Sequence, residues 1–431
     1  MAWEIINATL PDGQKAAIQI GGENIFSIGP PAGFSHAIDA DGLWVVPGLI
    51  DEHVHFRTPG EEHKEDWFTG TNAALAGGYT TVADMPNNKE PITTIQRLLK
   101  KMIAIGDKIP IGYRLWLAGV PSRISELDNM RGWRIIAGVK VYFDLSTGGL
   151  IVRDRVDRLA IASKCAEQRK VMAVHAESER IRLANEARIG RPFTVSDHCL
   201  IRSPESEHEA IKEAIEIQQC TGVEMLICHV STVAGFEEIL RAQDRGQNIH
   251  IEVCPHHLVL NSHLLDREDG AFFKVNPALR SPREAEILLD YFCAGRATTL
   301  AGDHAPHTIE EKQQQKYEEI PSGMPVIQNT FSLMYPLVAA GRMPLPTLIN
   351  MMSRNPARIL GMRDVGEIVQ GARADLMLFD PACEVAFKNE EQLTKSKWSP
   401  FALAGMRGMG VPKIVVSRGR IRYCGGAFVR D

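Results

Sequence analysis

The sequence predicts an α/β fold, a TIM-type (β/α)8 barrel beside a small β-sandwich domain that both chain ends build. Between residues 48 and 364, short apolar runs alternate with amphipathic helical stretches. Alternation of this kind over roughly 300 residues suits a parallel sheet covered by helices. The two ends contain short strand-like runs separated by turns rich in proline and glycine. We therefore expect the barrel over 48–364 and the β-sandwich over 1–47 plus 365–431.

The terminal segments are predicted as strands because apolar and polar residues alternate over short stretches between turn signals. The turns PDG, GGEN and GPPAG separate the N-terminal strands. The predicted strands are Trp3–Leu10, Ala16–Gly21, Asn24–Ile28 and Leu43–Val46 at the start, and Ala374–Phe379, Lys413–Ser417 and Arg420–Cys424 at the end.

The central region is predicted as repeated pairs of a helix and a following strand. A doubly wound open sheet is the alternative, and it is disfavoured because no GxGxxG-type loop follows the first strand. The polar segment Glu310–Glu319 is expected to be a solvated loop or helix. The pairs are Thr69–Ala76 with Thr80–Met85, Arg131–Ile136 with Gly138–Phe143, Asp154–Gln168 with Val171–His175, Glu207–Cys220 with Glu224–His229, Gly235–Gln243 with Ile249–Cys254, and Pro282–Ala294 with Thr298–Gly302.

The composition is that of an ordinary soluble globular protein. The chain has 431 residues, of which 44% are hydrophobic and 23% charged, and its net charge of −5 argues against broad binding to nucleic acid or to a membrane surface. The eight cysteines form no CxxC pair, which is typical of reduced thiols. No apolar run reaches membrane-spanning length, and the N-terminus lacks the features of a signal peptide. We expect a cytoplasmic protein.

Two histidines, His53 and His55, follow the apolar run that ends at Ile50. Side chains at i and i+2 of an extended segment point the same way, so both rings could hold one metal ion. Neutral imidazole is the commonest metal ligand in proteins. Arg57 lies on the same face and could bind an anion beside the ion.

Further ligand-type residues end or interrupt other apolar runs, and the carboxyl ends of barrel strands meet at one mouth. Each has an ordinary alternative: a histidine at a strand end could be a hydrogen-bonded packing residue, Asp303 could cap a helix, and Lys140 could pair with a carboxylate or reach solvent. Their joint occurrence at successive strand ends favours a metallohydrolase. They are Lys140 on the fourth strand, His175 on the fifth, His229 on the sixth and Asp303 on the eighth. The histidines at 36, 63, 198, 208, 250, 256, 257, 263 and 304 are expected to be structural.

These residues lie in motifs that resemble the dihydroorotases of the amidohydrolase superfamily. The HxH pair alone indicates the superfamily, whereas HxHxRxPG together with DMPN and DHAPH points to dihydroorotase. The resemblance covers nearly the whole chain. The matching segments are PGLIDEHVHFRTPG, EDWFTGTNAALAGGYTTVADMPN, AGVKVYF, VHAESE, CHVST, EVCPHHL, VNPALRSPREAE, GDHAPHT, PSGMP, PARILGM and GARADLMLFDP.

The resemblance implies two zinc ions bridged by a carboxylated lysine. One zinc would be held by His53, His55 and Asp303, and the second by His175 and His229. Lys140 would carry the carbamate, an anionic ligand for both ions. Some relatives use an aspartate in place of this lysine, so Asp144, four residues further on, leaves open a single zinc or a different bridge.

It also implies that Asp303 is the catalytic proton shuttle and that four residues bind the substrate. Arg57, Asn87 and His307 would contact its carboxylate, and Asn276 and the backbone near Gly323 would face its ring. Asn87 could instead be a turn residue after Pro86, and Arg57 could form a surface ion pair with Glu61 or Glu62.

The implied reaction is the reversible hydrolysis of L-dihydroorotate to N-carbamoyl-L-aspartate in pyrimidine biosynthesis, with a small-molecule substrate and a homo-oligomer, most simply a dimer. One alternative is another cyclic amidohydrolase, such as an allantoinase or a hydantoinase, whose substrate ring lacks the carboxylate. A second is a non-catalytic homologue that serves as a partner of aspartate carbamoyltransferase, although inactive relatives lose metal ligands and every ligand position is filled in this chain.

Overall fold

The computed structural model describes residues 2–145 and 149–429, and its centre is a sheet of eight parallel strands. The strands follow one another in chain order around the sheet. The last strand returns to the first, where the N–H of His55 donates to the carbonyl of His304 at 2.8 Å and Val54 bridges to His304. The strands therefore form a nearly closed barrel, which confirms the predicted fold class. They are β6 (Leu49–Val54), β7 (Tyr79–Asp84), β8 (Gly112–Ala118), β9 (Ile136–Tyr142), β10 (Val171–His175), β11 (Met225–Ile227), β12 (Ile249–Val253) and β13 (Thr299–Leu300).

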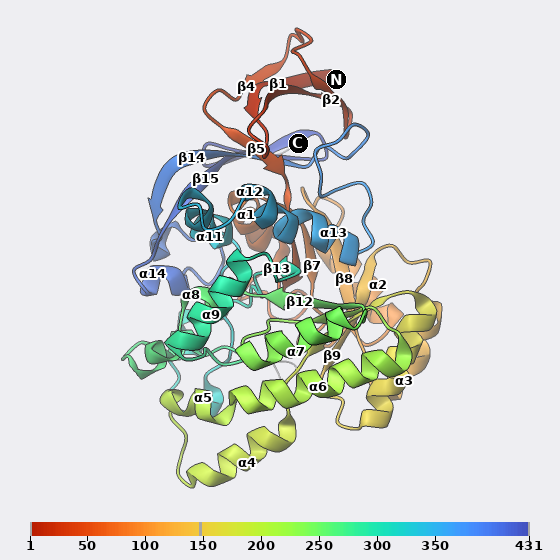
Figure 1. The fold of residues 1–431 in the computed structure, drawn as a ribbon, viewed down its shortest axis with the longest axis vertical. Helices are drawn as coiled ribbons and strands as arrows, with labels where there is room; N and C mark the ends of the chain where they lie inside the picture. The colour runs from red at the N-terminus through yellow and green to blue at the C-terminus, as the bar shows by residue number, and fades with distance from the viewer. Residues whose placement is uncertain (1, 146–148, 430–431) are drawn as a thin grey trace.

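A second sheet contains strands from both chain ends, as predicted. It lies at the upper end of the molecule in Figure 1, where red N-terminal and blue C-terminal strands meet. The ends are joined where β5 pairs with β14 antiparallel, with Val46 opposite Met377. The domain boundaries near residues 47 and 365 stay a prediction. The strands are β1 (Ala2–Thr9), β2 (Lys15–Gly21), β3 (Asn24–Gly29), β4 (Ala37–Asp39), β5 (Trp44–Pro47), β14 (Leu376–Ala386), β15 (Arg407–Ser417), β16 (Arg420–Cys424) and β17 (Ala427–Phe428).

Helices cover the outside of the barrel, and polar side chains fix where several begin. The Asp66 carboxylate caps α1 by accepting the N–H groups of Phe68 and Thr69, and Thr232 and Ser281 cap α7 and α9. The helices are α1 (Trp67–Ala76), α2 (Ile95–Ile105), α3 (Arg155–Gln168), α4 (Glu179–Ile189), α5 (His198–Ile201), α6 (Pro204–Thr221), α7 (Val233–Asp244), α8 (Pro255–Val259), α9 (Pro282–Cys293), α10 (Ile309–Lys312), α11 (Thr330–Ala339), α12 (Leu345–Ile349), α13 (Asn355–Ile359) and α14 (Pro400–Leu403).

Short 3-10 and π-helical turns complete the secondary structure. No helix in the described part of the chain combines the length and the apolar character needed to cross a membrane. The 3-10 turns are η1 (Pro121–Asn129), η2 (Val195–Asp197), η3 (Ser262–Asp266), η4 (Gly270–Phe273), η5 (Tyr317–Glu319) and η7 (Asn389–Glu391), and the π-helical turn is η6 (Asn350–Arg354).

Two local predictions are wrong. The predicted helix Arg131–Ile136 is a pair of turns that runs into β9, because six residues that include Gly132 offer too few hydrogen bonds to nucleate a helix. The segment Glu310–Glu319 contains α10 and η5 but is not wholly solvated, because the Lys312 side chain is completely buried.

The interior of the barrel is packed with apolar side chains, so it is a core and not a channel. Trp116 and Ile50 belong to this cluster together with Ala357 and Leu360 from the region of α13. At Gly138 the neighbouring strand comes so close that an added Cβ would lie 2.3 Å from the Val171 carbonyl oxygen. The polar residues predicted for the site lie at the ends of these strands.

Candidate metal centre

One cavity brings together the six predicted metal ligands. His53, His55, Lys140, His175, His229 and Asp303 all line it, as do the predicted substrate contacts Arg57, Asn87 and Asn276. His307 does not line this cavity; its Nε2 lies 3.1 Å from Nη2 of Arg57, so it contacts the arginine from behind. The six candidate ligands come from five strands and their following loops, as the barrel topology requires.

The Asp303 carboxylate faces two imidazole rings. Its Oδ1 lies 2.9 Å from Nε2 of His55 and 3.3 Å from Nε2 of His53. The His55 Nδ1 donates to the Asn87 amide oxygen at 2.7 Å, and the His53 Nδ1 donates to the Glu252 carboxylate at 2.7 Å. The single proton of each neutral ring is therefore on Nδ1, and the lone pair on each Nε2 points at Oδ1 of Asp303. Acceptors this close to one another fit a shared cation.

The protonation of these groups suits metal binding. Burial lowers the pKa of His53 to about 3 and that of His55 to about 4, so both rings are neutral at physiological pH. Burial alone would raise the pKa of Asp303, but the positive charge that His53 and His55 carry when protonated lowers this pKa well below its usual range, so Asp303 loses its proton before either ring does. Two neutral imidazoles and one carboxylate are ligands that zinc binds in proteins.

A second pair of nitrogens faces the cavity on the neighbouring strands. Nδ1 of His175 lies 3.0 Å from Nε2 of His229, and Nε2 of His175 donates to the Glu177 carboxylate at 2.8 Å. Among the described residues, Nδ1 of His229 has no hydrogen-bond partner although it is buried. The arrangement offers a second group of nitrogen ligands beside the first.

Lys140 lies on β9, fully buried, with its ammonium donating to Sγ of Cys228 at 2.8 Å. Its position in the cavity wall is compatible with a carbamate that points at both groups of ligands. Asp144, in contrast, is bound by the guanidinium of Arg182 at 2.7 Å and is absent from the cavity wall. The fold therefore offers no place for Asp144 as a bridging ligand.

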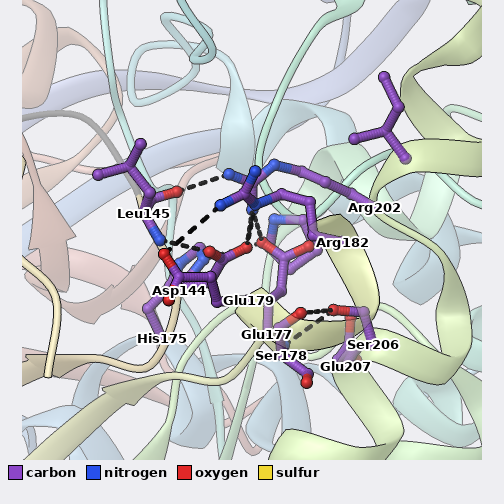
Figure 2. A network of polar contacts seen from close by, with 12 residues as sticks. Asp144, Leu145, His175, Glu177, Ser178, Glu179, Arg182, Arg202, Ser206 and Glu207 are labelled. Carbon is purple, nitrogen blue, oxygen red and sulfur yellow. Dashed lines mark hydrogen bonds and ion pairs between the residues drawn. The ribbon is translucent and has the colours of Figure 1, made fainter. Parts of the chain in front are cut away.

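A buried network of charges holds His175 from behind (Figure 2). Arg202 donates to the Glu177 carboxylate at 2.5 Å, to the Leu145 carbonyl at 2.5 Å and to Asp144 at 3.5 Å. Burial would raise the pKa of Glu177, but Arg202 and His175 hold it well below its usual range. An ionised carboxylate behind a ligand histidine fixes the orientation of the ring.

Three site residues have left-handed backbone conformations that non-glycine residues rarely adopt. The φ angles are 60° at Arg57, 39° at His229 and 48° at Asp303. Such conformations cost of order 1–3 kcal/mol each and persist where the surrounding structure holds them. Each of these residues lies just beyond the end of a strand, so the unusual backbone turns its side chain toward the cavity.

Three of the substrate contacts predicted from the sequence line the same cavity as the candidate ligands. Arg57 is only 2% exposed, donates from Nε to the Pro306 carbonyl at 3.2 Å, and has no ion pair with Glu61 or Glu62 among the described residues. Asn87 is not merely a turn residue, because its amide supports His55. The buried Oδ1 of Asn276 has no partner in the described part of the chain.

Several residues of the site were missed by the sequence analysis. Tyr142 and Ser322 line the cavity, and Glu177, Glu252 and Cys228 contact its ligands. A signal existed for Tyr142, which follows Lys140 by two positions on the same strand, and for Glu177, two positions after His175. No local pattern marks Glu252, which meets His53 across 199 positions of sequence.

Comparison with known proteins places this architecture in a family. Residues 44–182 and 299–422 match the amidohydrolase family. A dihydroorotase of Methanothermobacter thermautotrophicus is 33% identical over 90% of this chain and 85% of its own length. An allantoinase of Rubrobacter xylanophilus is 32% identical over 94% of this chain and 90% of its own.

The solved structures agree on the fold. An L-hydantoinase (dihydropyrimidinase) from Arthrobacter aurescens superposes with a TM-score of 0.94 at 27% identity, covering 100% of this chain and 97% of that one. Family, fold and cavity therefore lead to one conclusion: the chain belongs to the amidohydrolase family and is a hydrolytic enzyme.

Proposed function

We propose that the protein is a zinc-dependent dihydroorotase, which reversibly hydrolyses L-dihydroorotate to N-carbamoyl-L-aspartate. The observation that carries the proposal is Arg57, a buried guanidinium in the wall of the same cavity as the candidate ligands. A cationic fork of this kind suits a substrate carboxylate. A ring that lacks a carboxylate would leave the buried charge without an ion-pair partner among the described residues.

The candidate ligands fit two zinc ions, one on His53, His55 and Asp303 and the other on His175 and His229. Lys140 would join them as a carbamate, because an unmodified ammonium would repel two cations. When bound, the ions would supply an activated water and polarise the carbonyl that is attacked. Glu252, Asn87 and Glu177 would keep the lone pairs of three ligand rings turned toward the cavity.

Asp303 is proposed as the proton carrier. Its carboxylate, held ionised by the two histidines, would accept a proton from the attacking water as the new C–O bond forms. The same group would deliver that proton to the amide nitrogen as the ring C–N bond breaks. In the reverse direction it would take the proton from the amide nitrogen that closes the ring.

The substrate would be oriented by residues of the cavity wall that are not candidate metal ligands. Arg57 would bind the carboxylate, and His307 would hold the arginine in place through their 3.1 Å contact. The Asn276 amide, whose buried oxygen has no partner within the described residues, would meet the ring. Asn87 would contribute from beside His55.

A second candidate is another cyclic amidohydrolase. The allantoinase relative and the hydantoinase neighbour favour it, because their overall similarity to this chain is close to that of the dihydroorotases. Their rings carry no carboxylate, so Arg57 distinguishes the two candidates. Dimer formation and association with aspartate carbamoyltransferase stay predictions.

The direct test is to assay the purified enzyme, supplied with zinc and bicarbonate, against dihydroorotate, N-carbamoyl-L-aspartate, allantoin and hydantoin. We expect turnover of the first two and about two zinc ions per chain by elemental analysis. Hydrolysis of allantoin or hydantoin without turnover of dihydroorotate would favour the second candidate. Less than one metal ion per chain together with no turnover of any of the four would favour a non-catalytic role.

A further inference from the structure

Two short segments form a part of the cavity wall that carries no candidate metal ligand. They are Lys274–Asn276 and Pro321–Gly323, here called the wall segments, and Val275, Asn276, Ser322 and Gly323 face the cavity from them. Neither belongs to a strand or a helix. One backbone hydrogen bond joins the two segments, from the Gly323 N–H to the Lys274 carbonyl at 3.0 Å, and the rest of their position has to be set by side-chain contacts.

The ammonium of Lys312 connects the two wall segments. Its Nζ donates to the carbonyls of Lys274 at 3.1 Å, Pro321 at 2.9 Å and Gly323 at 3.2 Å. An ammonium has three N–H donors and no acceptor, so three carbonyls satisfy it fully. The side chain is completely buried at the end of α10, and no carboxylate within the described residues forms an ion pair with it.

Lys274 makes the complementary connection. Its Nζ donates to the carbonyls of Tyr317 at 2.6 Å and Ile320 at 2.7 Å, and lies 3.7 Å from the centre of the Tyr317 ring. The Tyr317 hydroxyl is 2.8 Å from Nδ1 of His198, whose Nε2 donates to the Val275 carbonyl at 2.8 Å. Lys274 of the first wall segment is thus hydrogen-bonded to the residues that directly precede the second wall segment.

The wall also reaches the proposed carboxylate site. The Ser322 carbonyl lies 3.2 Å from Nε2 of His307, which in turn contacts Arg57. At Gly323 the chain passes so close to Ala305 that an added Cβ would lie 2.6 Å from the Ala305 carbonyl oxygen. A shift of Pro321–Gly323 would therefore be felt both at the carboxylate site and at the loop that follows Asp303.

The desolvation cost of the buried Lys312 ammonium indicates that this residue does more than fill space in the core. A buried ammonium without a counter-ion carries a desolvation penalty of several kcal/mol, which an apolar side chain of similar volume avoids. The ammonium fixes the relative position of the two wall segments, because it binds three of their carbonyl oxygens at one point. Rigid support of this kind is what a binding wall built from loops requires.

We propose that Lys312 is a positioning residue for the substrate: its ammonium holds the wall segments so that Asn276 and the backbone at Ser322 and Gly323 meet the ring. The identity of the substrate rests on the proposed function. The role of Lys312 in holding the wall segments does not depend on it. Lys312 touches neither the cavity nor a candidate metal ligand, so it acts only through the backbone that it binds.

The test compares Lys312→Met with a matched control, Lys316→Met. Methionine keeps the length and apolar stem of lysine and removes the three donors, and Lys316 lies in the same segment with a side chain that is 73% exposed. For Lys312→Met we expect a KM raised by about tenfold or more, a kcat changed by less than about threefold, and unchanged zinc content. The control should match wild type in all three.

Hydrogen exchange provides a readout that needs no substrate. In Lys312→Met, peptides covering 274–277 and 320–323 should exchange at least about tenfold faster, while peptides from the barrel strands keep wild-type rates. An unchanged KM, or faster exchange spread evenly over the whole chain, would overturn the proposal. Should Lys312→Met not fold, Lys274→Met removes the complementary contacts and is held to the same expectations.

Failure of this inference can be told apart from failure of the proposed function. If wild type does not turn over dihydroorotate, the proposed function is wrong, and the KM comparison is made with whichever cyclic amide it hydrolyses. If wild type turns over dihydroorotate and Lys312→Met keeps its KM, only the positioning role is wrong.

Discussion

Replacing Arg57 with methionine should weaken the binding of dihydroorotate strongly and spare rings that carry no carboxylate. The guanidinium is 2% exposed, and its Nε already donates to the Pro306 carbonyl while Nη2 lies against His307. The remaining N–H groups can give a substrate carboxylate about two charged hydrogen bonds, each contributing about 1.5–3 kcal/mol. Two such bonds amount to about 3–6 kcal/mol, and their loss corresponds to a KM raised by roughly two to four orders of magnitude.

Steady-state kinetics with dihydroorotate and with hydantoin measure this effect, and Arg57→Lys serves as the matched control. Lysine keeps the charge but not the planar fork, so its KM should lie between those of wild type and Arg57→Met. A KM for dihydroorotate within about threefold of wild type would refute the carboxylate role. An equal rise of the KM for hydantoin would show that Arg57 supports the structure of the cavity and does not bind the carboxylate.

Three further predictions concern the chemistry and the stability of the fold. Asp303→Asn should lower kcat by roughly 10²–10⁴ with an unchanged melting temperature, because it removes the proton carrier; a near-normal rate would contradict that role. Gly138→Ala should lower the free energy of unfolding by about 1–3 kcal/mol in urea titrations, since the new Cβ would lie 2.3 Å from a carbonyl oxygen; an unchanged midpoint would mean that the strands can separate. Burial lowers the pKa of Lys170 from its ordinary 10.5 to about 8 in the folded protein. Between pH 8 and 10.5 the unfolded chain therefore binds more protons at Lys170 than the folded chain does. The free energy of unfolding should rise with pH in this range, by at most about 1.4 kcal/mol per pH unit. Lys170→Met should flatten that slope, and an identical slope would exclude Lys170 as its source.

Much of the candidate site could be predicted because its residues interrupt regular local patterns. His175 ends a run of five residues whose first four are apolar; the run is too short for a helix and follows a clear helical stretch. The carboxyl ends of the strands of a parallel barrel lie at the same end of the barrel. A pattern recognised in each strand separately therefore predicts that residues far apart in the sequence lie together. The failures have the same origin. Arg131–Ile136 showed a helical pattern that was too short to form a helix, and the polar surroundings of Lys312 concealed its burial.

The sequence by itself determined the barrel, the sheet from both chain ends and the set of candidate ligands, since each depends on the periodicity or chemistry of a few neighbouring residues. Only the tertiary structure decided what holds them. Glu252 behind His53, Arg202 behind Glu177 and Lys312 behind the cavity wall are charged residues with no local signature. Their roles come from contacts across the fold, where burial in a medium of low dielectric makes each hydrogen bond and each charge matter more than at the surface.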